Sequence, residues 1–104
     1  MAKRNDEVKK IVTYFLDEVR KKYSIDRAYL YGSFAKGTSN KWSDIDIAII
    51  SPDFSDDLFE ERLNLMQLAA SIDDRIEPKP YKRELFVRND PLVDEIQKNG
   101  IQFI

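Results

Sequence analysis

The sequence contains no cysteine and no histidine among its 104 residues. Without cysteine there can be no disulfide, no thiolate metal site and no cysteine nucleophile. Without histidine there is no imidazole to serve as a general base, a nucleophile or a metal ligand. Any catalysis must therefore use carboxylates, hydroxyls, lysine, arginine, tyrosine or a hard cation held by oxygen atoms.

The chain also lacks a marked excess of either charge and any long apolar run. Its 17 basic and 19 acidic residues leave a net charge of −2, so direct nucleic-acid binding is not expected. No apolar segment approaches the length of a membrane span, and the first ten residues lack the core of a signal peptide. We therefore expect a cytoplasmic protein with no membrane association, folded as a single domain over residues 1–104.

The first half of the chain is expected to form a helix, two strands and a short helical turn. Apolar residues at three- and four-residue steps predict a helix over residues 5–23, with Asn5 as its N-cap. Short apolar runs predict strands at residues 27–31 and 44–50. Between them, residues 32–37 are bracketed by glycines and are long enough only for one turn of helix.

The second half is expected to add two helices and a third strand. A helix is predicted over residues 57–73, where Asp57 and Glu60 have the spacing of a capping box. Its apolar residues fall into two neighbouring rows: Phe59, Leu63, Met66 and Ala70 in one, and Leu65, Leu68 and Ile72 in the other. A strand over residues 75–81 contains two prolines, which suit an edge position.

The chain should end with a helix and a short apolar tail. Asp90 followed by Pro91 predicts a helix start, and Asn99 followed by Gly100 predicts its end. The tail, residues 101–104, is apolar enough to pack, to pair at a sheet edge or to contact a partner. The order of elements predicts an α/β (α+β) fold in which a small mixed sheet is packed with helices.

Two aspartates on one predicted strand are the first candidate site. Side chains two residues apart on a strand share a face, so Asp44 and Asp46 should point the same way while Ile45 and Ile47 face the core. Two like charges side by side are costly unless a cation neutralises them, and Mg²⁺ prefers such hard oxygen ligands. The alternative is a strand that simply begins with two exposed aspartates.

A glycine and a serine lie at the junction between the preceding strand and the helical turn. The backbone N–H groups of such a turn favour phosphate, and Gly32 would let an anion approach the backbone closely. Ser33 could donate its hydroxyl to a phosphate oxygen, a role compatible with that of a helix N-cap. Lys36 could contact a phosphate as a point charge or could be an exposed loop lysine.

Gly32-Ser33, ten intervening residues and then Asp44-x-Asp46 resemble the signature of the nucleotidyltransferases related to the DNA polymerase β palm. The longer segment GSFAKGTSNKWSDIDIAII resembles the minimal nucleotidyltransferases in particular. The members of that family are often encoded beside a helical HEPN-type protein as a toxin–antitoxin pair. The resemblance covers nearly the whole chain and implies the palm-like fold of that family.

The family pattern implies a third carboxylate on a later, neighbouring strand. Glu77 is the candidate, although many members have Asp there, and it could instead be an ordinary exposed strand residue. Asp73 and Asp74 are its rivals at the end of the preceding helix. Trp42 could lie beside the nucleotide base or could cover the edge of the core.

The resemblance implies transfer of a nucleoside monophosphate from an NTP, with ATP as the expected donor, to an acceptor hydroxyl. Gly32, Ser33, Lys36 and Trp42 would bind the nucleotide. Asp44, Asp46 and Glu77 would be the catalytic residues and would hold Mg²⁺, with two ions expected. The chain would act as an antitoxin, in a homo- or hetero-oligomer, on a HEPN-type partner that supplies the acceptor. The alternatives are a catalytically silent antitoxin and a nucleotide-binding regulatory subunit.

Overall fold

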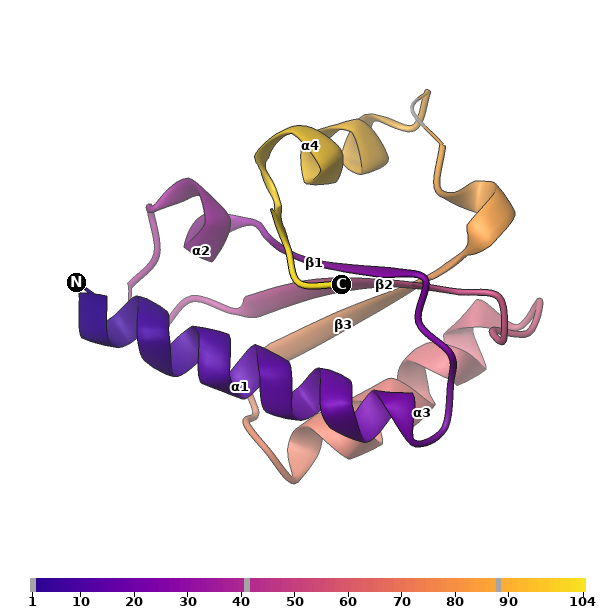
Figure 1. The fold of residues 1–104 in the computed structure, drawn as a ribbon, viewed down its shortest axis with the longest axis horizontal. Coiled ribbons are helices and arrows are strands. Elements are labelled where there is room, and N and C mark those ends of the chain that lie inside the picture. The colour runs from indigo at the N-terminus through magenta and orange to yellow at the C-terminus, as the bar shows by residue number, and fades with distance from the viewer. Residues whose placement is uncertain (1, 41, 88) are drawn as a thin grey trace.

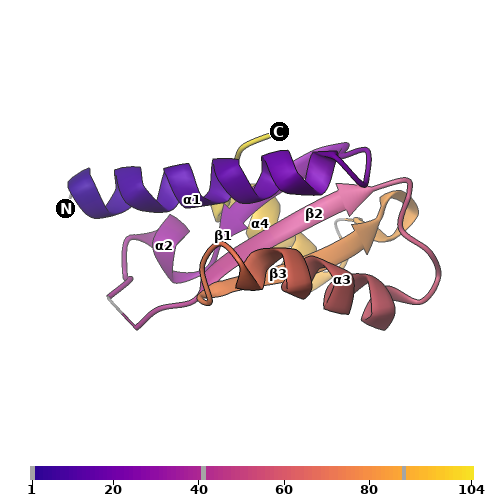
Figure 2. The ribbon, with the colours of Figure 1, turned by 90° about the horizontal axis from the view of Figure 1, so that it is seen from below.

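A four-stranded sheet separates the helices into two layers (Figure 1). The computed structural model describes residues 2–40, 42–87 and 89–104. The helices α1 and α3 cover one face of the sheet, and α4 covers part of the other (Figures 1 and 2). This arrangement confirms the predicted mixed sheet packed with helices. None of the helices in these described ranges is long and apolar enough to cross a membrane.

The strands lie in the order β3-β2-β1-β4, with β1 spanning Arg27–Tyr31 and β2 spanning Ile45–Ser51. The two pair antiparallel, and β2 pairs parallel to β3, Ile76–Lys82, on its other side. The apolar, β-branched run of β2 suits a central strand that is buried on both faces. The two prolines of β3 lie on an edge strand, as predicted.

The larger core lies between the sheet and the α1/α3 layer. From α1, Ala2–Arg20, the apolar stripe that includes Val12, Phe15 and Val19 is fully buried against Ile45, Ile47 and Ile49 of β2. The prediction that Asn5 caps this helix is wrong, because the helix begins at Ala2 and Asn5 lies inside it. Residues 2–4 are favourable or tolerated in helices, so the helix extends beyond the first candidate cap.

Helix α3, Leu58–Ala70, begins as predicted but buries only one of its two apolar rows. Asp57 caps it by accepting a hydrogen bond from the N–H of Glu60. Leu65 is fully buried in the larger core. The side chains of Phe59, Leu63 and Met66 remain 73%, 40% and 39% exposed. The structure therefore leaves an apolar row, Phe59, Leu63 and Met66, on the outer side of α3.

A buried glutamate ties the start of α3 to the end of α1. Glu61 is 7% exposed and accepts hydrogen bonds from the Tyr23 hydroxyl at 2.7 Å and from the Ser55 N–H at 2.8 Å. The Asn64 amide is a third, longer donor at 3.4 Å. Burial alone would raise the pKa of Glu61, but these hydrogen bonds outweigh it and hold the pKa below its ordinary value of 4.5.

Helix α4, Pro91–Asn99, packs on the opposite face of the sheet. Asp90 caps it by accepting from the N–H groups of Leu92 and Val93. Val93 and Ile96 are fully buried in a second core that also holds Tyr29 and Tyr81. Between β3 and α4, a short 3-10 helix, η1, spans Arg83–Leu85.

The apolar tail completes the sheet by pairing at its edge, which is one of the outcomes that the sequence allowed, and a contact of the tail with a partner stays a prediction. Ile101–Gln102 form β4, which pairs antiparallel with β1 at the edge. The Phe103 N–H donates to the Ala28 carbonyl at 2.8 Å, and the side chains of Ile101, Phe103 and Ile104 pack against the larger core. Burial of these three side chains makes the tail part of the fold.

Candidate active site

Three residues from three adjacent strands form a row across one face of the sheet. Tyr31 of β1 is the register partner of Asp46 of β2, and Asp46 is in turn the register partner of Glu77 of β3. Alternation along each strand places all three on the face that α4 covers elsewhere. Asp44, two residues before Asp46, extends the row just outside the start of β2. The parallel pairing of β2 with β3 thus brings the predicted third carboxylate beside the first pair.

An open cavity of about 370 Å³ lies over this row, beyond the part of the sheet that α4 covers. Three carboxylates line it together with one arginine, one lysine and one tyrosine. The lining residues are Tyr31, Asp44, Asp46, Arg62, Glu77, Pro78, Lys79 and Leu92. A cavity that gathers acidic and basic groups from separate elements has the composition expected of a site for a charged substrate.

Gly32 lies directly against Asp46. Its φ of 74° and ψ of −148° fall in a region that is almost closed to residues with a side chain. A Cβ atom at this position would lie 2.3 Å from Oδ2 of Asp46, so only glycine fits there without displacing the carboxylate. The predicted glycine turn and the predicted acidic strand therefore meet at one point.

Negative charge is concentrated in this row. Burial, with the neighbouring charges of Asp44 and Glu77, raises the pKa of Asp46 to about 6. Burial, and then the Asp46 charge, raises the pKa of the Tyr31 hydroxyl well above its ordinary value, so that it stays protonated. A divalent cation would relieve this repulsion between carboxylates, and hard oxygen atoms are the ligands that Mg²⁺ prefers.

Glu77 is not turned toward a common point with the two aspartates. Its Oε2 accepts a hydrogen bond at 3.3 Å from the Arg62 guanidinium, which comes from α3. Within the ranges that the structure describes, no three acidic side chains are gathered closely enough to enclose an ion. Carboxylate oxygens are ligands of the right chemical type for Mg²⁺. Glu77 would have to break its hydrogen bond with Arg62 to join the two aspartates as a ligand.

The other predicted nucleotide-binding residues are not among those that line this cavity. Ser33 is half-buried at the first position of α2, Ser33–Lys36, so Gly32 and not Ser33 is the N-cap residue. Lys36 forms an ion pair with Glu95 of α4 at 2.8 Å. The side chain of Trp42 is 80% exposed, and the backbone N–H of this residue donates to Asn40 Oδ1. The structure places Gly32 against Asp46, and the nucleotide-binding roles of Gly32, Ser33, Lys36 and Trp42 stay predictions.

Sequence reasoning missed three polar residues of the cavity. Arg62 is on α3, Lys79 follows Glu77 by two residues on β3, and Tyr31 is the last residue of β1. Lys79 could have been found from the alternation of side chains along β3, because residues 77 and 79 of a strand lie on the same face. Arg62 gave no such signal, since α3 lies on the other face of the sheet and its side chain reaches the site around the β3 edge.

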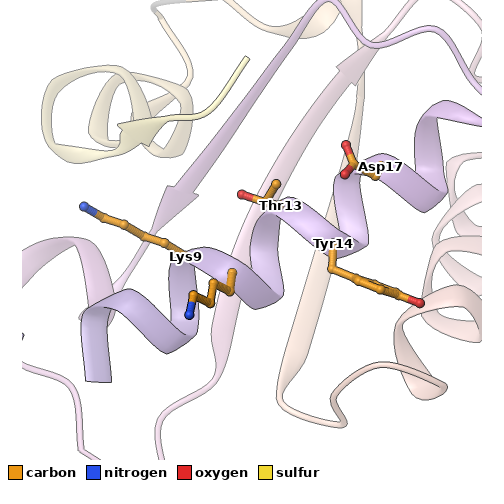
Figure 3. A pocket seen from close by; sticks show the side chains of 5 residues that line it. Lys9, Thr13, Tyr14 and Asp17 are labelled. Carbon is orange, nitrogen blue, oxygen red and sulfur yellow. The ribbon is translucent and has the colours of Figure 1, made fainter. Parts of the chain in front are cut away.

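A second hollow, of about 340 Å³, lies on the outer side of α1 and is not a comparable site. Figure 3 shows the side chains that line it: Lys9, Lys10, Thr13, Tyr14 and Asp17. All five come from one helix, and only one of them is acidic. Among the described residues no second element supplies groups that line this hollow, which distinguishes it from the cavity over the carboxylate row.

The mixed sheet carries a carboxylate row beside a glycine turn, and comparison with known families identifies the class of enzyme. A family model described as "Nucleotidyltransferase domain" matches residues 12–101. The chain belongs to this nucleotidyltransferase family, and the matched region contains the glycine turn and all three carboxylates. Members of the family generally use divalent metals.

Three solved structures resemble the chain. A candidate nucleotidyltransferase from Sulfolobus solfataricus has a TM-score of 0.69 at 18% identity, over 98% of this chain and 84% of that one. Two mutants of the toxin–antitoxin MntA-HpeT have TM-scores of 0.58, at 28% and 26% identity. The two matches cover 92% and 91% of this chain, and each covers 70% of the chain in the solved structure. No curated protein matches the chain by sequence.

Proposed function

We propose that this nucleotidyltransferase moves a nucleoside monophosphate from ATP to a hydroxyl group on a protein partner. One observation supports the proposal: Asp46, which is the register partner of Glu77 and lines the same cavity as Asp44, lies directly against Gly32. Backbone that would bind phosphate and a carboxylate that would bind metal are thus adjacent, which supports transfer from a triphosphate. The sequence has no histidine, so we assign the role of proton acceptor for the acceptor hydroxyl to a site carboxylate.

Each residue has a defined part in this reaction. The backbone at Gly32 and the Ser33 hydroxyl would bind the outer phosphates, while Lys36 and Trp42 would contact the nucleotide. Asp44, Asp46 and Glu77 would hold Mg²⁺, with two ions expected. Bound Mg²⁺ supplies charge neutralisation at the α-phosphate and lowers the pKa of the acceptor hydroxyl.

In the transfer itself, the acceptor oxygen forms a bond to the α-phosphorus as the bond to the departing pyrophosphate breaks. The acceptor proton passes to a site carboxylate, for which Glu77 is our candidate. Glu77 lies on the edge strand β3, where an acceptor from a second protein can approach. The open cavity leaves room for such an acceptor beside the nucleotide.

We further propose that the partner is a helical HEPN-type toxin and that the chain acts as its antitoxin. The resemblance to MntA-HpeT supports this proposal. One of those two mutants replaces two aspartates, two positions apart, by glutamates, which is the spacing of Asp44 and Asp46. The exposed row Phe59, Leu63 and Met66 is a suitable contact surface, because apolar patches of this kind mark protein interfaces.

We also propose that residues 1–104 act as a single domain in the cytoplasm, where ATP and such a partner are present together. The functional unit is a hetero-oligomer with the toxin. The described residues contain no large basic surface that lines the cavity: Arg62 and Lys79 are its two cations, and three carboxylates face them. This near balance of positive and negative side chains in the cavity favours a nucleotide and a protein as substrates over a nucleic-acid chain.

The test is incubation of the chain with α-labelled ATP, Mg²⁺ and the protein encoded beside it, followed by mass spectrometry of both proteins. We expect label on a hydroxyl of the partner, lost in Asp46→Asn and kept in the matched control Asp74→Asn. Asp74 is exposed and lies outside the cavity. Neutralisation of the partner by Asp46→Asn without label would favour the catalytically silent antitoxin instead. Label transfer by Asp46→Asn at the normal rate would contradict the proposed site.

A further inference from the structure

The contact between Arg62 and Glu77 is placed where a metal ion would compete with it. Arg62 Nη2 lies 3.3 Å from Glu77 Oε2, and both side chains line the cavity over the carboxylate row. The other cation of the lining, Lys79, has its ammonium 5.6 Å from the centre of the Tyr81 ring. Among the described residues, Arg62 is therefore the cation that forms an ion pair with one of the three site carboxylates.

This ion pair has the properties of a reversible contact. It is a single hydrogen bond of moderate length, whereas a tight arginine–carboxylate pair is bidentate and shorter. The two side chains are 48% and 37% exposed, so water can replace either partner when the pair opens. By contrast, Arg83 holds Asp26 through two hydrogen bonds, at 2.6 and 2.9 Å, far from the cavity lining.

Glu77 cannot serve Arg62 and a metal ion equally well. A divalent cation that is shared with Asp46 would draw Glu77 toward the aspartates and repel the guanidinium. The freed guanidinium would still be part of the cavity wall, where a planar cation is well suited to bind phosphate oxygens.

We propose that Arg62 is a positioning residue: it holds Glu77 in the metal-free protein and moves to the triphosphate when metal and nucleotide bind. This inference rests on the proposed metal-dependent nucleotide site. It assigns two opposite effects to one side chain. Arg62 weakens the binding of a metal ion alone, and it strengthens the binding of a metal–nucleotide complex.

The experiment measures the binding of Mn²⁺ alone from the free-ion signal in electron paramagnetic resonance, and the binding of Mn²⁺–ATP to the purified chain by calorimetric titration. Arg62→Met should bind Mn²⁺ alone about three- to tenfold more tightly than the unmodified chain, because a competing positive charge is removed. It should bind Mn²⁺–ATP about tenfold more weakly. Arg62→Lys, which keeps the charge but not the planar fork, should leave Mn²⁺ binding weak and restore only part of the ATP effect.

The matched control is Arg83→Met, which removes an exposed arginine and its ion pair outside the cavity and should change neither affinity. Thermal melts of each variant identify loss of folding. If Arg62→Met binds Mn²⁺ with the same affinity as the unmodified chain, and also binds Mn²⁺–ATP with the same affinity as the unmodified chain, this inference alone is overturned. Failure of the unmodified chain to bind Mn²⁺ more tightly than Asp46→Asn would overturn the proposed site itself.

Discussion

Gly32 and Gly37 provide a matched pair of substitutions that separates backbone strain from damage to the site. Both glycines bracket α2 and both have positive φ, 74° and 76°. A Cβ at Gly32 would lie 2.3 Å from Asp46 Oδ2, whereas a Cβ at Gly37 would meet nothing within 4 Å. Alanine at either position is strained, but only Gly32→Ala forces Asp46 to move.

The strain alone has a similar magnitude at the two sites. The conformation of Gly32 is nearly restricted to glycine and should cost about 1–3 kcal/mol with alanine. Gly37 is in the left-handed helical region, where alanine costs about 1–2 kcal/mol. For a chain of this size each kcal/mol lowers the melting temperature by about 4–8 °C. Both variants should therefore melt several degrees below the unmodified chain.

Nucleotide binding should distinguish the variants. Calorimetric titration with ATP in excess Mg²⁺, at a temperature where both variants are folded, should show at least about tenfold weaker binding for Gly32→Ala. Gly37→Ala should bind normally. Equal binding by the two variants, or a loss of the same size in both, would refute the proposal that Gly32 keeps Asp46 in position for metal and nucleotide binding.

Four further outcomes follow from the packing and charge of the chain. Glu61→Gln should lower the free energy of unfolding by about 1.5–3 kcal/mol at pH 7 in urea titrations. Because the pKa of Glu61 is lowered by folding, that difference should shrink as the pH falls below about 4.5, and a constant difference would contradict the buried carboxylate. Deletion of residues 101–104 should cost about 3 kcal/mol, since three half-buried apolar side chains are lost; an unchanged urea midpoint would contradict their packing. Phe59→Ser with Leu63→Ser should change stability by less than about 0.5 kcal/mol and yet weaken the toxin complex in size-exclusion chromatography, whereas an intact complex would exclude this surface. Asp46→Asn should stabilise the metal-free chain by about 1 kcal/mol, after allowance for screening by solvent, because it removes a repelled charge; destabilisation would contradict the electrostatics of the row.

The elements of the fold followed from local patterns wherever those patterns were strong. The β-branched run of β2, the Asp57 cap of α3 and the Asp90-Pro91 start of α4 all predicted elements that the structure contains. The predicted start of α1 at Asn5 was wrong, because a helix can begin before the first residue that could cap it. The tail was ambiguous because an apolar segment at the end of a chain suits an edge strand and an interface equally.

Part of the candidate site could be predicted because several of its residues lie close together in the sequence. Gly32, Asp44 and Asp46 flank one hairpin-like connection between β1 and β2, so their proximity follows from antiparallel pairing. Glu77 needed the parallel register of β3 with β2, which only the family resemblance indicated. Arg62 could not be found in this way, since its contact with Glu77 depends on how α3 packs beside the sheet edge.

The most direct test of a single metal-dependent site is to locate a bound paramagnetic ion in the folded chain. Mn²⁺, added in small amounts with ATP to the ¹⁵N-labelled protein, broadens the amide signals nearest to it in a two-dimensional NMR spectrum. We predict selective loss of the signals of Gly32, Asp46 and Glu77, while Thr13 and Tyr14 beside the α1 hollow keep theirs. Broadening centred on any other part of the chain, or uniform broadening without a centre, would contradict the account.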